Sequence, residues 1–144
     1  MQIIKKYQVF LFDADNTLYD YDAAEANALR IVLEHCGFEY SDEIRAKYRK
    51  INATAWASWE NGEMSKEYMQ VWRFECLLKE IGLHRNAADF NTKYLAELGK
   101  GAILIDGAEE VCRRITAAGR QIYIATNGLL ATQEARKHSA IQNM

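Results

Sequence analysis

Residues 8–18 read Gln-Val-Phe-Leu-Phe-Asp-Ala-Asp-Asn-Thr-Leu, an apolar run that stops at two aspartates separated by one residue. The run Val9–Phe12 is short, bulky and free of polar residues, which predicts a strand buried on both faces, as in a parallel sheet. Asp13 and Asp15 stand at the carboxyl end of this strand, where open α/β sheets bind their ligands. The sequence therefore predicts a parallel α/β fold with a polar site at this strand end.

The two aspartates indicate a chemical role. Carboxylates this close repel one another unless a cation or a transferable proton lies between them, and a hard divalent ion meets that need. The structural alternative is a strand end followed by an Asx-type turn, with Asn16 and Thr17 as turn residues. That alternative explains the turn but not two acids beside a buried strand, because burying an unpaired charge is costly.

A second apolar run ends in a similar way far downstream. The run Gln121-Ile122-Tyr123-Ile124-Ala125 precedes Thr126-Asn127-Gly128, which predicts another strand, then a small hydroxyl residue and a turn. The segment from Leu129 to His138 predicts a helix whose first turn presents free N–H groups to an anion. Thr-Asn-Gly alone is a weak signal, since Asn-Gly is a common turn dipeptide. Its order and strand context favour a functional interpretation here.

The chain between the two runs is much longer than the crossover of about a dozen residues that parallel strands need. Capping residues and glycine ends predict four amphipathic helices in it. They cover about Asp22–Cys36, Ser41–Glu60, Ser65–Ile81 and Asn86–Leu98, with stops at Gly37, Asn61-Gly62, Gly82 and Gly99. Four such helices with short joins indicate an up-and-down bundle. A further helix, Gly107–Ala118, then returns the chain to the second strand, with Asp106 as an expected N-cap and Gly119 as its stop.

We therefore expect residues 1–20 and 100–144 to form a partial α/β core and residues 21–99 to form an inserted helical domain. A strand, an insert, a helix and a second strand are the start of a parallel sheet with right-handed crossovers. The insert concentrates aromatic residues, namely Trp56, Trp59, Tyr68, Trp72 and Phe74. Their helical spacing favours packing in a core over stacking on a ligand.

The first motif resembles motif I of the haloacid dehalogenase (HAD) superfamily of phosphotransferases, Asp-x-Asp-x-Thr after an apolar strand, and the second resembles its motif II. The resemblance implies that Asp13 is the nucleophile that takes up a phosphoryl group. It implies that Asp15 protonates the leaving alkoxide and then deprotonates water. It also implies a Mg²⁺ ion held by the Asp13 carboxylate and the Asp15 main-chain carbonyl. The residues implied in phosphate binding are Ala14, Thr17, Thr126, Asn127 and Gly128.

Within this superfamily the chain is most similar to the pyrimidine 5′-nucleotidase branch. The likeness rests on Phe-Asp-Ala-Asp-Asn-Thr-Leu-Tyr, on an all-helical insert with Asn61-Gly62 and on Ile-Ala-Thr-Asn-Gly. It implies a Rossmann-like parallel sheet with a helical cap, and Mg²⁺-dependent hydrolysis of a phosphate monoester through an aspartyl-phosphate. Nucleoside 5′-monophosphates are the leading substrates. Dehalogenation is disfavoured, because the dehalogenating branch lacks the second acid, which is Asp15 here.

The superfamily also uses motif III, a Lys or Arg that neutralises the phosphate, and motif IV, an acidic pair at the metal. Neither can be located, since only Ser139–Met144 follow the last expected helix. Arg136 and Lys137 lie on that helix and are interpreted as solvated side chains. The chain is thus expected to be the N-terminal part of an enzyme and, alone, inactive or impaired. Half a sheet also predicts an uncovered face and self-association.

Two alternatives remain open. The missing motifs III and IV are compatible with a non-catalytic fragment or binding remnant of the same fold. A signalling module that forms phospho-aspartate would use similar strand-end acids, but its compact sheet has no room for an insert of residues 21–99.

Composition excludes several classes of protein. A chain of 144 residues with 49% hydrophobic content can form packed interiors, and a net charge of −2 gives no reason to expect a nucleic-acid or membrane partner. No window approaches a membrane span. Three widely separated cysteines without a C-x-x-C pair favour a reducing cytoplasm. The expected partner is a small phosphorylated substrate, and the sequence leaves its nucleobase and the oligomeric state open.

Overall fold

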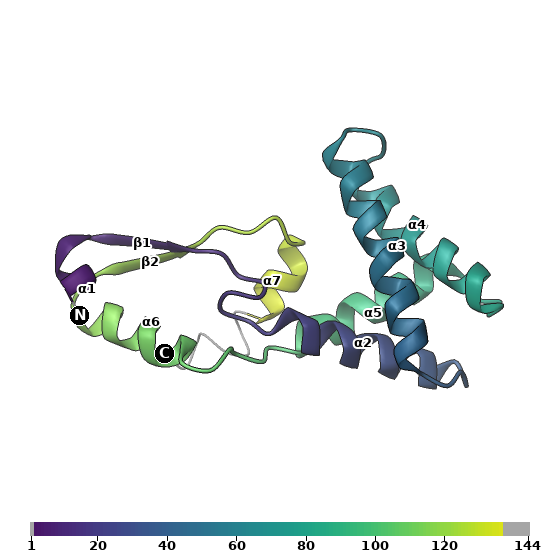
Figure 1. Ribbon diagram of the computed structural model, residues 1–144, viewed down its shortest axis with the longest axis horizontal. Helices are drawn as coiled ribbons and strands as arrows, with labels where there is room; N and C mark the ends of the chain where they lie inside the picture. The colour runs from purple at the N-terminus through teal and green to yellow at the C-terminus, as the bar shows by residue number, and fades with distance from the viewer. Residues whose placement is uncertain (1, 137–144) are drawn as a thin grey trace. The chain divides into compact units, whose positions relative to one another are not determined.

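The structure is a computed structural model that describes residues 2–136 (Figure 1). Its elements, in chain order, are α1 Gln2–Lys6, β1 Val9–Phe12, α2 Tyr21–His35, α3 Asp42–Glu60, α4 Lys66–Ile81, α5 Ala87–Lys100, α6 Ala108–Ala117, β2 Gln121–Ile124 and α7 Leu130–Arg136. The chain divides into two compact units, the first formed by Met1–Glu25 with Leu98–Met144 and the second by Ala26–Glu97. The division falls inside α2 and α5 rather than at their ends.

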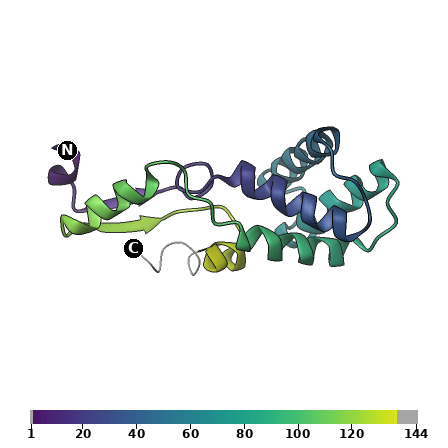
Figure 2. The ribbon, with the colours of Figure 1, turned by 90° about the horizontal axis from the view of Figure 1, so that it is seen from below.

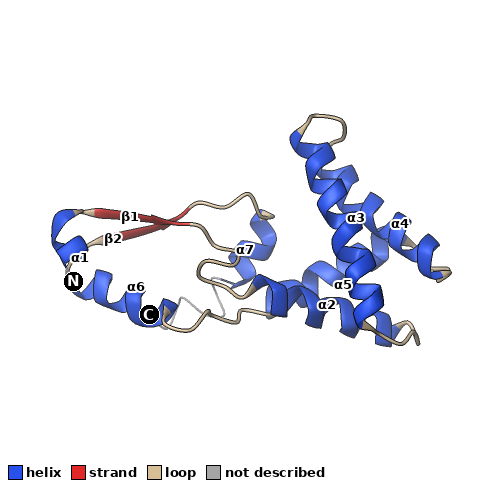
Figure 3. Ribbon diagram, viewed as in Figure 1, coloured by secondary structure: helices blue, strands red, loops and turns tan. Residues whose placement is uncertain are grey.

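The first unit contains a parallel sheet of β1 and β2, drawn in red in Figure 3. Val9 pairs with Gln121 at one end of the sheet and Phe12 pairs with Ile124 at the other. The Ala125 N–H donates to the Phe12 carbonyl at 2.8 Å, which extends the pairing one step beyond the strands. The parallel α/β class expected from the sequence is confirmed. The loops that carry the two motifs both follow the carboxyl ends of the strands, on the same side of the sheet.

The expectation that β1 is buried on both faces is wrong. Val9 is 50% exposed and Leu11 is 67% exposed, and Tyr123 on the neighbouring strand is 53% exposed. Phe12 and Ile122, which point to the other side, pack on a hydrophobic cluster. Burial of both faces requires a layer on each, and residues 2–136 place a helix, α6, against one face of the sheet.

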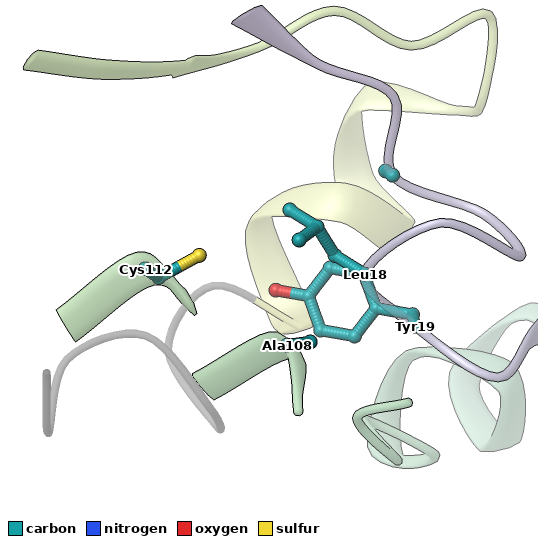
Figure 4. Packing of buried hydrophobic residues seen from close by; sticks show 5 residues of the cluster. Leu18, Tyr19, Ala108 and Cys112 are labelled. Atoms are coloured by element: carbon teal, nitrogen blue, oxygen red, sulfur yellow. The ribbon is translucent and has the colours of Figure 1, made fainter. Parts of the chain in front are cut away.

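Helix α6 covers that face. Figures 1 and 2 show α6 running alongside the sheet, and Figure 4 shows Leu18 and Tyr19, from the loop after β1, gathered with Ala108 and Cys112 of α6. These α6 residues recur at helical spacing, which gives the helix one apolar face. On its other side Glu110 pairs with Arg113 and Arg114. Burial raises the pKa of the Cys112 thiol, so this cysteine is a core residue.

Two predicted helix ends are wrong. The cap of α6 is Gly107, at φ 85° and with no side-chain cap hydrogen bond, so Asp106 does not cap it; glycine adopts this left-handed conformation at little cost. Helix α5 runs through Gly99 to Lys100. A Cβ on Gly99 would lie 3.0 Å from the Cβ of Ala135. Gly99 therefore permits a close approach of α7 instead of ending α5.

Several other predicted helix ends agree with the structure. Ser41 and Ser65 are the N-caps of α3 and α4, and their hydroxyls accept from the N–H groups of Ile44 and Tyr68. Gly82, at φ 69°, ends α4. Helix α1 was not expected from the sequence. The predicted helix from Leu129 to His138 is described only as far as Arg136, and its last residues lie outside the described part of the chain.

The second unit has an aromatic core. Tyr48 of α3, Phe74 of α4 and Tyr94 of α5 are fully buried, and Tyr48 stacks on Phe74 with ring centroids 5.5 Å apart. The hydroxyl of Tyr48 donates to that of Tyr94 at 3.0 Å. Tyr68, expected on the same core face, is 51% exposed, because it lies on the outer side of α4. Three helices thus share one core around Phe74.

The first unit also contains the two segments through which the chain leaves this unit and later returns to it. The Asp20 N–H donates to the Ile103 carbonyl at 2.8 Å, and the Ile105 N–H donates to the Leu18 carbonyl at 2.9 Å. A Cβ on Gly101 would lie 3.1 Å from the Cβ of Ala24. The outgoing and returning segments are therefore bonded to one another. None of the helices in residues 2–136 is long and apolar enough to cross a membrane.

Candidate active site

The loop after β1 is a tight turn that brings two motif residues together. The carbonyl of buried Ala14 accepts the N–H groups of Leu18 and Tyr19, both at 3.0 Å. This turn folds Thr17 back toward the strand end, where its hydroxyl donates to Oδ2 of Asp13 at 3.0 Å. The Asp13 carboxylate is exposed, so it is oriented by Thr17 and remains open to a ligand.

Asn16 stabilises the same turn from its outer side. It adopts the left-handed conformation at φ 58°, which asparagine tolerates better than most residues. Its side-chain oxygen accepts the Tyr21 N–H at 3.1 Å, at the start of α2. Asn16 and Thr17 are therefore turn residues, as the structural alternative supposed, while Thr17 also holds Asp13.

The loop after β2 starts from the strand position next to Asp13. Because Phe12 pairs with Ile124, the residues that follow them leave the sheet side by side. The Thr126 hydroxyl accepts the Gly128 N–H at 3.0 Å, which closes this loop into a compact turn.

The second motif aspartate is linked to α7. Oδ2 of Asp15 accepts from the Gln133 side-chain amide at 3.3 Å, and Oδ1 forms an ion pair with Nη1 of Arg136. The Arg136 side chain is 1% exposed, so the interpretation of Arg136 as a solvated residue is wrong. The pairing with Asp15 and the ring of Tyr19, 5.5 Å from the guanidinium, explain its burial. Lys137 lies outside the described residues.

The Tyr19 ring belongs to the hydrophobic cluster and also faces the Arg136 guanidinium. It is 2% exposed. Burial raises the pKa of its hydroxyl, and the positive charge of Arg136 opposes that rise. Tyr19 therefore stays neutral and serves as an apolar wall for the arginine.

The donors expected for Mg²⁺ fit the ion in kind. Both carboxylate oxygens of Asp15 are engaged by α7, which leaves its main-chain carbonyl and the Asp13 carboxylate as hard oxygen donors. Mg²⁺ is commonly held by one or two carboxylates with water and substrate oxygens completing the shell. Within residues 2–136 no three His, Cys, Asp or Glu side chains form a metal cluster, so these two residues would supply a partial ligand set.

A cavity of about 570 Å³ is lined by residues of α6, β2 and α7 in the first unit. Leu18, Leu104 and Ile122 contribute apolar walls, and Thr126 and Gln133 reach its polar side. A phosphate group is poorly suited to such a lining, because desolvating its charge without enough hydrogen-bond donors is costly. The strand-end loops are therefore the better position for an anion.

Sequence reasoning missed Gln133 and Arg136. Arg136 was interpreted as a solvated residue of a surface helix, which is the usual environment of an arginine, and Gln133 was given no role. The available signal was their spacing, three residues apart on one face of the helix that directly follows Thr126-Asn127-Gly128.

A parallel sheet whose two strands end in Asp-x-Asp-x-Thr and Thr-Asn-Gly loops defines a Rossmann-like α/β core with a carboxylate site at the strand ends. The chain belongs to the haloacid dehalogenase-like hydrolase family, whose family model matches residues 7–142. The family suggested by the two motifs is thereby confirmed.

Relatives with curated names place the chain within this family. It is 37% identical to the HAD-hydrolase YfnB of Bacillus subtilis over 92% of this chain and 56% of that protein. It is 29% identical to the pyrimidine 5′-nucleotidase PynA of Streptococcus pneumoniae over 90% of this chain and 55% of that protein. It is 24% identical to the pyrimidine 5′-nucleotidase YjjG of Escherichia coli over 91% of this chain and 56% of that protein. The chain spans about half the length of these relatives.

A solved structure gives the same result for the fold. The crystal structure of YfnB bound to magnesium superimposes with a TM-score of 0.86 at 36% identity, covering 93% of this chain and 60% of YfnB. The resemblance therefore extends over almost all of the chain.

Proposed function

We propose that the whole protein carrying this chain is a Mg²⁺-dependent phosphohydrolase that acts on phosphate monoesters through an aspartyl-phosphate. The observation that carries the proposal is the exposed Asp13 carboxylate at the end of β1, held by the Thr17 hydroxyl at 3.0 Å. A carboxylate that is oriented yet open to solvent suits a nucleophile.

In the first step an Asp13 oxygen attacks the phosphorus of the substrate. The phosphorus–oxygen bond to the leaving group breaks, and the alkoxide receives a proton from Asp15. In the second step Asp15 takes a proton from water, whose oxygen attacks the same phosphorus. The acyl-phosphate bond then breaks, which restores the Asp13 carboxylate and releases inorganic phosphate.

The phosphate oxygens would be held by the two loops at the strand ends. Backbone N–H groups at Ala14 and Asn127 and the Thr126 hydroxyl are donors of the kind that bind phosphate. The Gly128 N–H donates to the Thr126 hydroxyl and would exchange this bond for one to a phosphate oxygen. The Asp13 carboxylate and the Asp15 carbonyl would hold Mg²⁺. When bound, the ion offsets the charges that meet as the nucleophile approaches the phosphate.

Nucleoside 5′-monophosphates are the substrates that we propose to test first. Two relatives, PynA and YjjG, are named pyrimidine 5′-nucleotidases, and the inserted helices would act as a cap over the site. The YfnB structure is described as revealing interdomain movement. We place the reaction in the cytoplasm, in keeping with three unpaired cysteines.

The test uses the whole protein with Mg²⁺ and a panel of nucleoside 5′-monophosphates and sugar phosphates, and it measures released inorganic phosphate. Asp13→Asn should reduce kcat at least about 1,000-fold, because amides are poor nucleophiles. Asp106→Asn is the matched control, since Asp106 is exposed and outside the site. Acid quenching of the wild type should trap a phosphoprotein that hydroxylamine cleaves.

Two outcomes would contradict the proposal. If Asp13→Asn retains most of the activity, Asp13 is not the nucleophile. If no phosphate monoester is turned over, the non-catalytic alternative gains support.

A further inference from the structure

We propose that Gln133 and Arg136 of α7 are positioning residues that fix the carboxylate of Asp15. The inference rests on the proposed function for its catalytic consequence, because Asp15 is the proton carrier there. It assigns to α7 a role that the two sequence motifs do not contain.

Each oxygen of the Asp15 carboxylate has its own donor on α7. Gln133 Nε2 donates to Oδ2 at 3.3 Å, and Arg136 Nη1 pairs with Oδ1. The two donors are three residues apart and so lie on one face of the helix. A carboxylate held at both oxygens cannot rotate about its terminal bond without losing a hydrogen bond. Each oxygen keeps a second lone pair that can take up a proton, and the two contacts fix the direction in which it points.

Stability alone does not account for Arg136. Its side chain is 1% exposed, whereas that of Asp15 is 28% exposed. Within the described part of the chain, Nε and Nη2 of Arg136 are buried and have no hydrogen-bond partner. Burying a guanidinium with one ion pair costs desolvation that the pair does not fully offset, and an apolar residue of similar size is often as stable. Stability therefore does not require an arginine at this position, which points to its contact with Asp15 as its role.

Gln133 also connects this contact to the second motif. A Cβ on Gly128 would collide with Nε2 and the amide carbon of Gln133. The amide is thus packed against the Thr126–Gly128 turn while it donates to Asp15. One side chain therefore sets the position of Asp15 relative to the proposed phosphate loop.

The first experiment measures unfolding in urea and needs no activity. Asp15→Asn should lower the urea midpoint, because it leaves Arg136 buried without its counter-charge. Arg136→Met should leave the midpoint unchanged or higher, since the exposed Asp15 can be solvated. Adding Arg136→Met to Asp15→Asn should restore the midpoint toward that of the wild type. A midpoint unchanged by Asp15→Asn, or one that the second substitution does not restore, overturns the inference.

The second experiment measures kinetics of the whole protein with p-nitrophenyl phosphate and Mg²⁺. Arg136→Met and Gln133→Leu should each lower kcat, by up to about 100-fold for a misplaced catalytic group, with KM unchanged because the phosphate loop is intact. Arg136→Lys should recover part of the lost kcat, since the charge is kept. Arg113→Met, at an exposed ion pair on α6, is the control and should change neither parameter.

The two experiments separate the inference from the proposed function. A protein without phosphatase activity that still shows the urea rescue contradicts the function and supports the positioning of Asp15. An active protein in which Arg136→Met and Gln133→Leu keep full kcat, or raise KM alone, overturns the positioning role and leaves the function standing.

Discussion

The two units each bury one arginine, and the two arginines differ in what they contact. In the second unit Arg73 is 2% exposed and donates to Asn52 at 2.9 Å, to Asn91 at 3.3 Å and to the Gln70 carbonyl at 3.2 Å. In the first unit Arg136 has one acceptor, Asp15, and two nitrogens without partners among the described residues. A buried guanidinium that has an acceptor at each of its three nitrogens loses less solvation energy than one that has an acceptor at a single nitrogen.

The same contrast extends to the apolar residues. The insert buries Tyr48, Phe74 and Tyr94 completely, and Phe74 contacts rings from three neighbours. The sheet of the first unit leaves Leu11 and Tyr123 more than half exposed. We infer that substitutions in the insert mainly change stability, while those near the strand ends mainly change chemistry. Four substitutions test this difference.

The largest effect is expected for Phe74→Ala. It removes a fully buried ring with neighbours at centroid distances of 5.0 Å to 5.5 Å, and such a truncation costs about 3–5 kcal/mol of unfolding free energy. Urea denaturation measures the change. Tyr68→Ala, on the same helix but 51% exposed, should cost far less. Equal losses for both would show that the insert lacks the ordered core described above.

Arg73→Met should destabilise the protein by about 1–3 kcal/mol, because it leaves the amide oxygens of Asn52 and Asn91 without their donors in the interior. The informative comparison is with Arg136→Met, for which no loss is expected. Measuring both by urea unfolding sharpens the contrast between the units. An equal loss of unfolding free energy for Arg73→Met and Arg136→Met would contradict the contrast between the two units.

Ser65→Ala tests a helix start and has a smaller expected effect. The Ser65 hydroxyl accepts the Tyr68 N–H at 3.1 Å, and losing such a cap costs about 1 kcal/mol. Ser65→Gly should cost only about a few tenths of a kcal/mol of unfolding free energy, because glycine is a fair N-cap. Thermal unfolding of the two variants provides the measurement, and a larger loss for glycine would argue against a capping role.

Leu11→Thr should have the smallest effect on stability, since Leu11 is 67% exposed and threonine keeps a good strand propensity. Its expected consequence is weaker self-association of the chain, because an exposed apolar face promotes association. Light scattering over a range of concentrations would detect the change. Unfolding free energy lowered by more than about 1 kcal/mol would show that the face is covered.

Local signals were sufficient to predict several parts of this molecule. Ser41, Ser65 and Gly82 mark helix ends through contacts within a few residues of the chain, and the structure has them as expected. The motif Asp13-x-Asp15-x-Thr17 likewise depends on a short turn, which the structure closes with a bond from Thr17 to Asp13.

Features that depend on distant partners were predicted less well. The exposure of Leu11 depends on which layers cover the sheet, and no residue near it in the sequence carries that information. Gly99 looked like a helix stop, but its role depends on Ala135 of another helix. Arg136 was interpreted as solvated because most arginines are; only the folded chain places it against Asp15.

The hydrogen bonds between residues 18–20 and residues 103–105 have a consequence for how this protein could evolve. Because the Asp20 N–H donates to the Ile103 carbonyl, the chain leaves the first unit and re-enters it at adjacent points. For a flexible connection, doubling its length raises the entropy cost of closure by only about 0.6 kcal/mol. Helices between these points could therefore be lengthened, shortened or exchanged during evolution with little change in the sheet, so specificity could diversify while the strand-end site stayed constant.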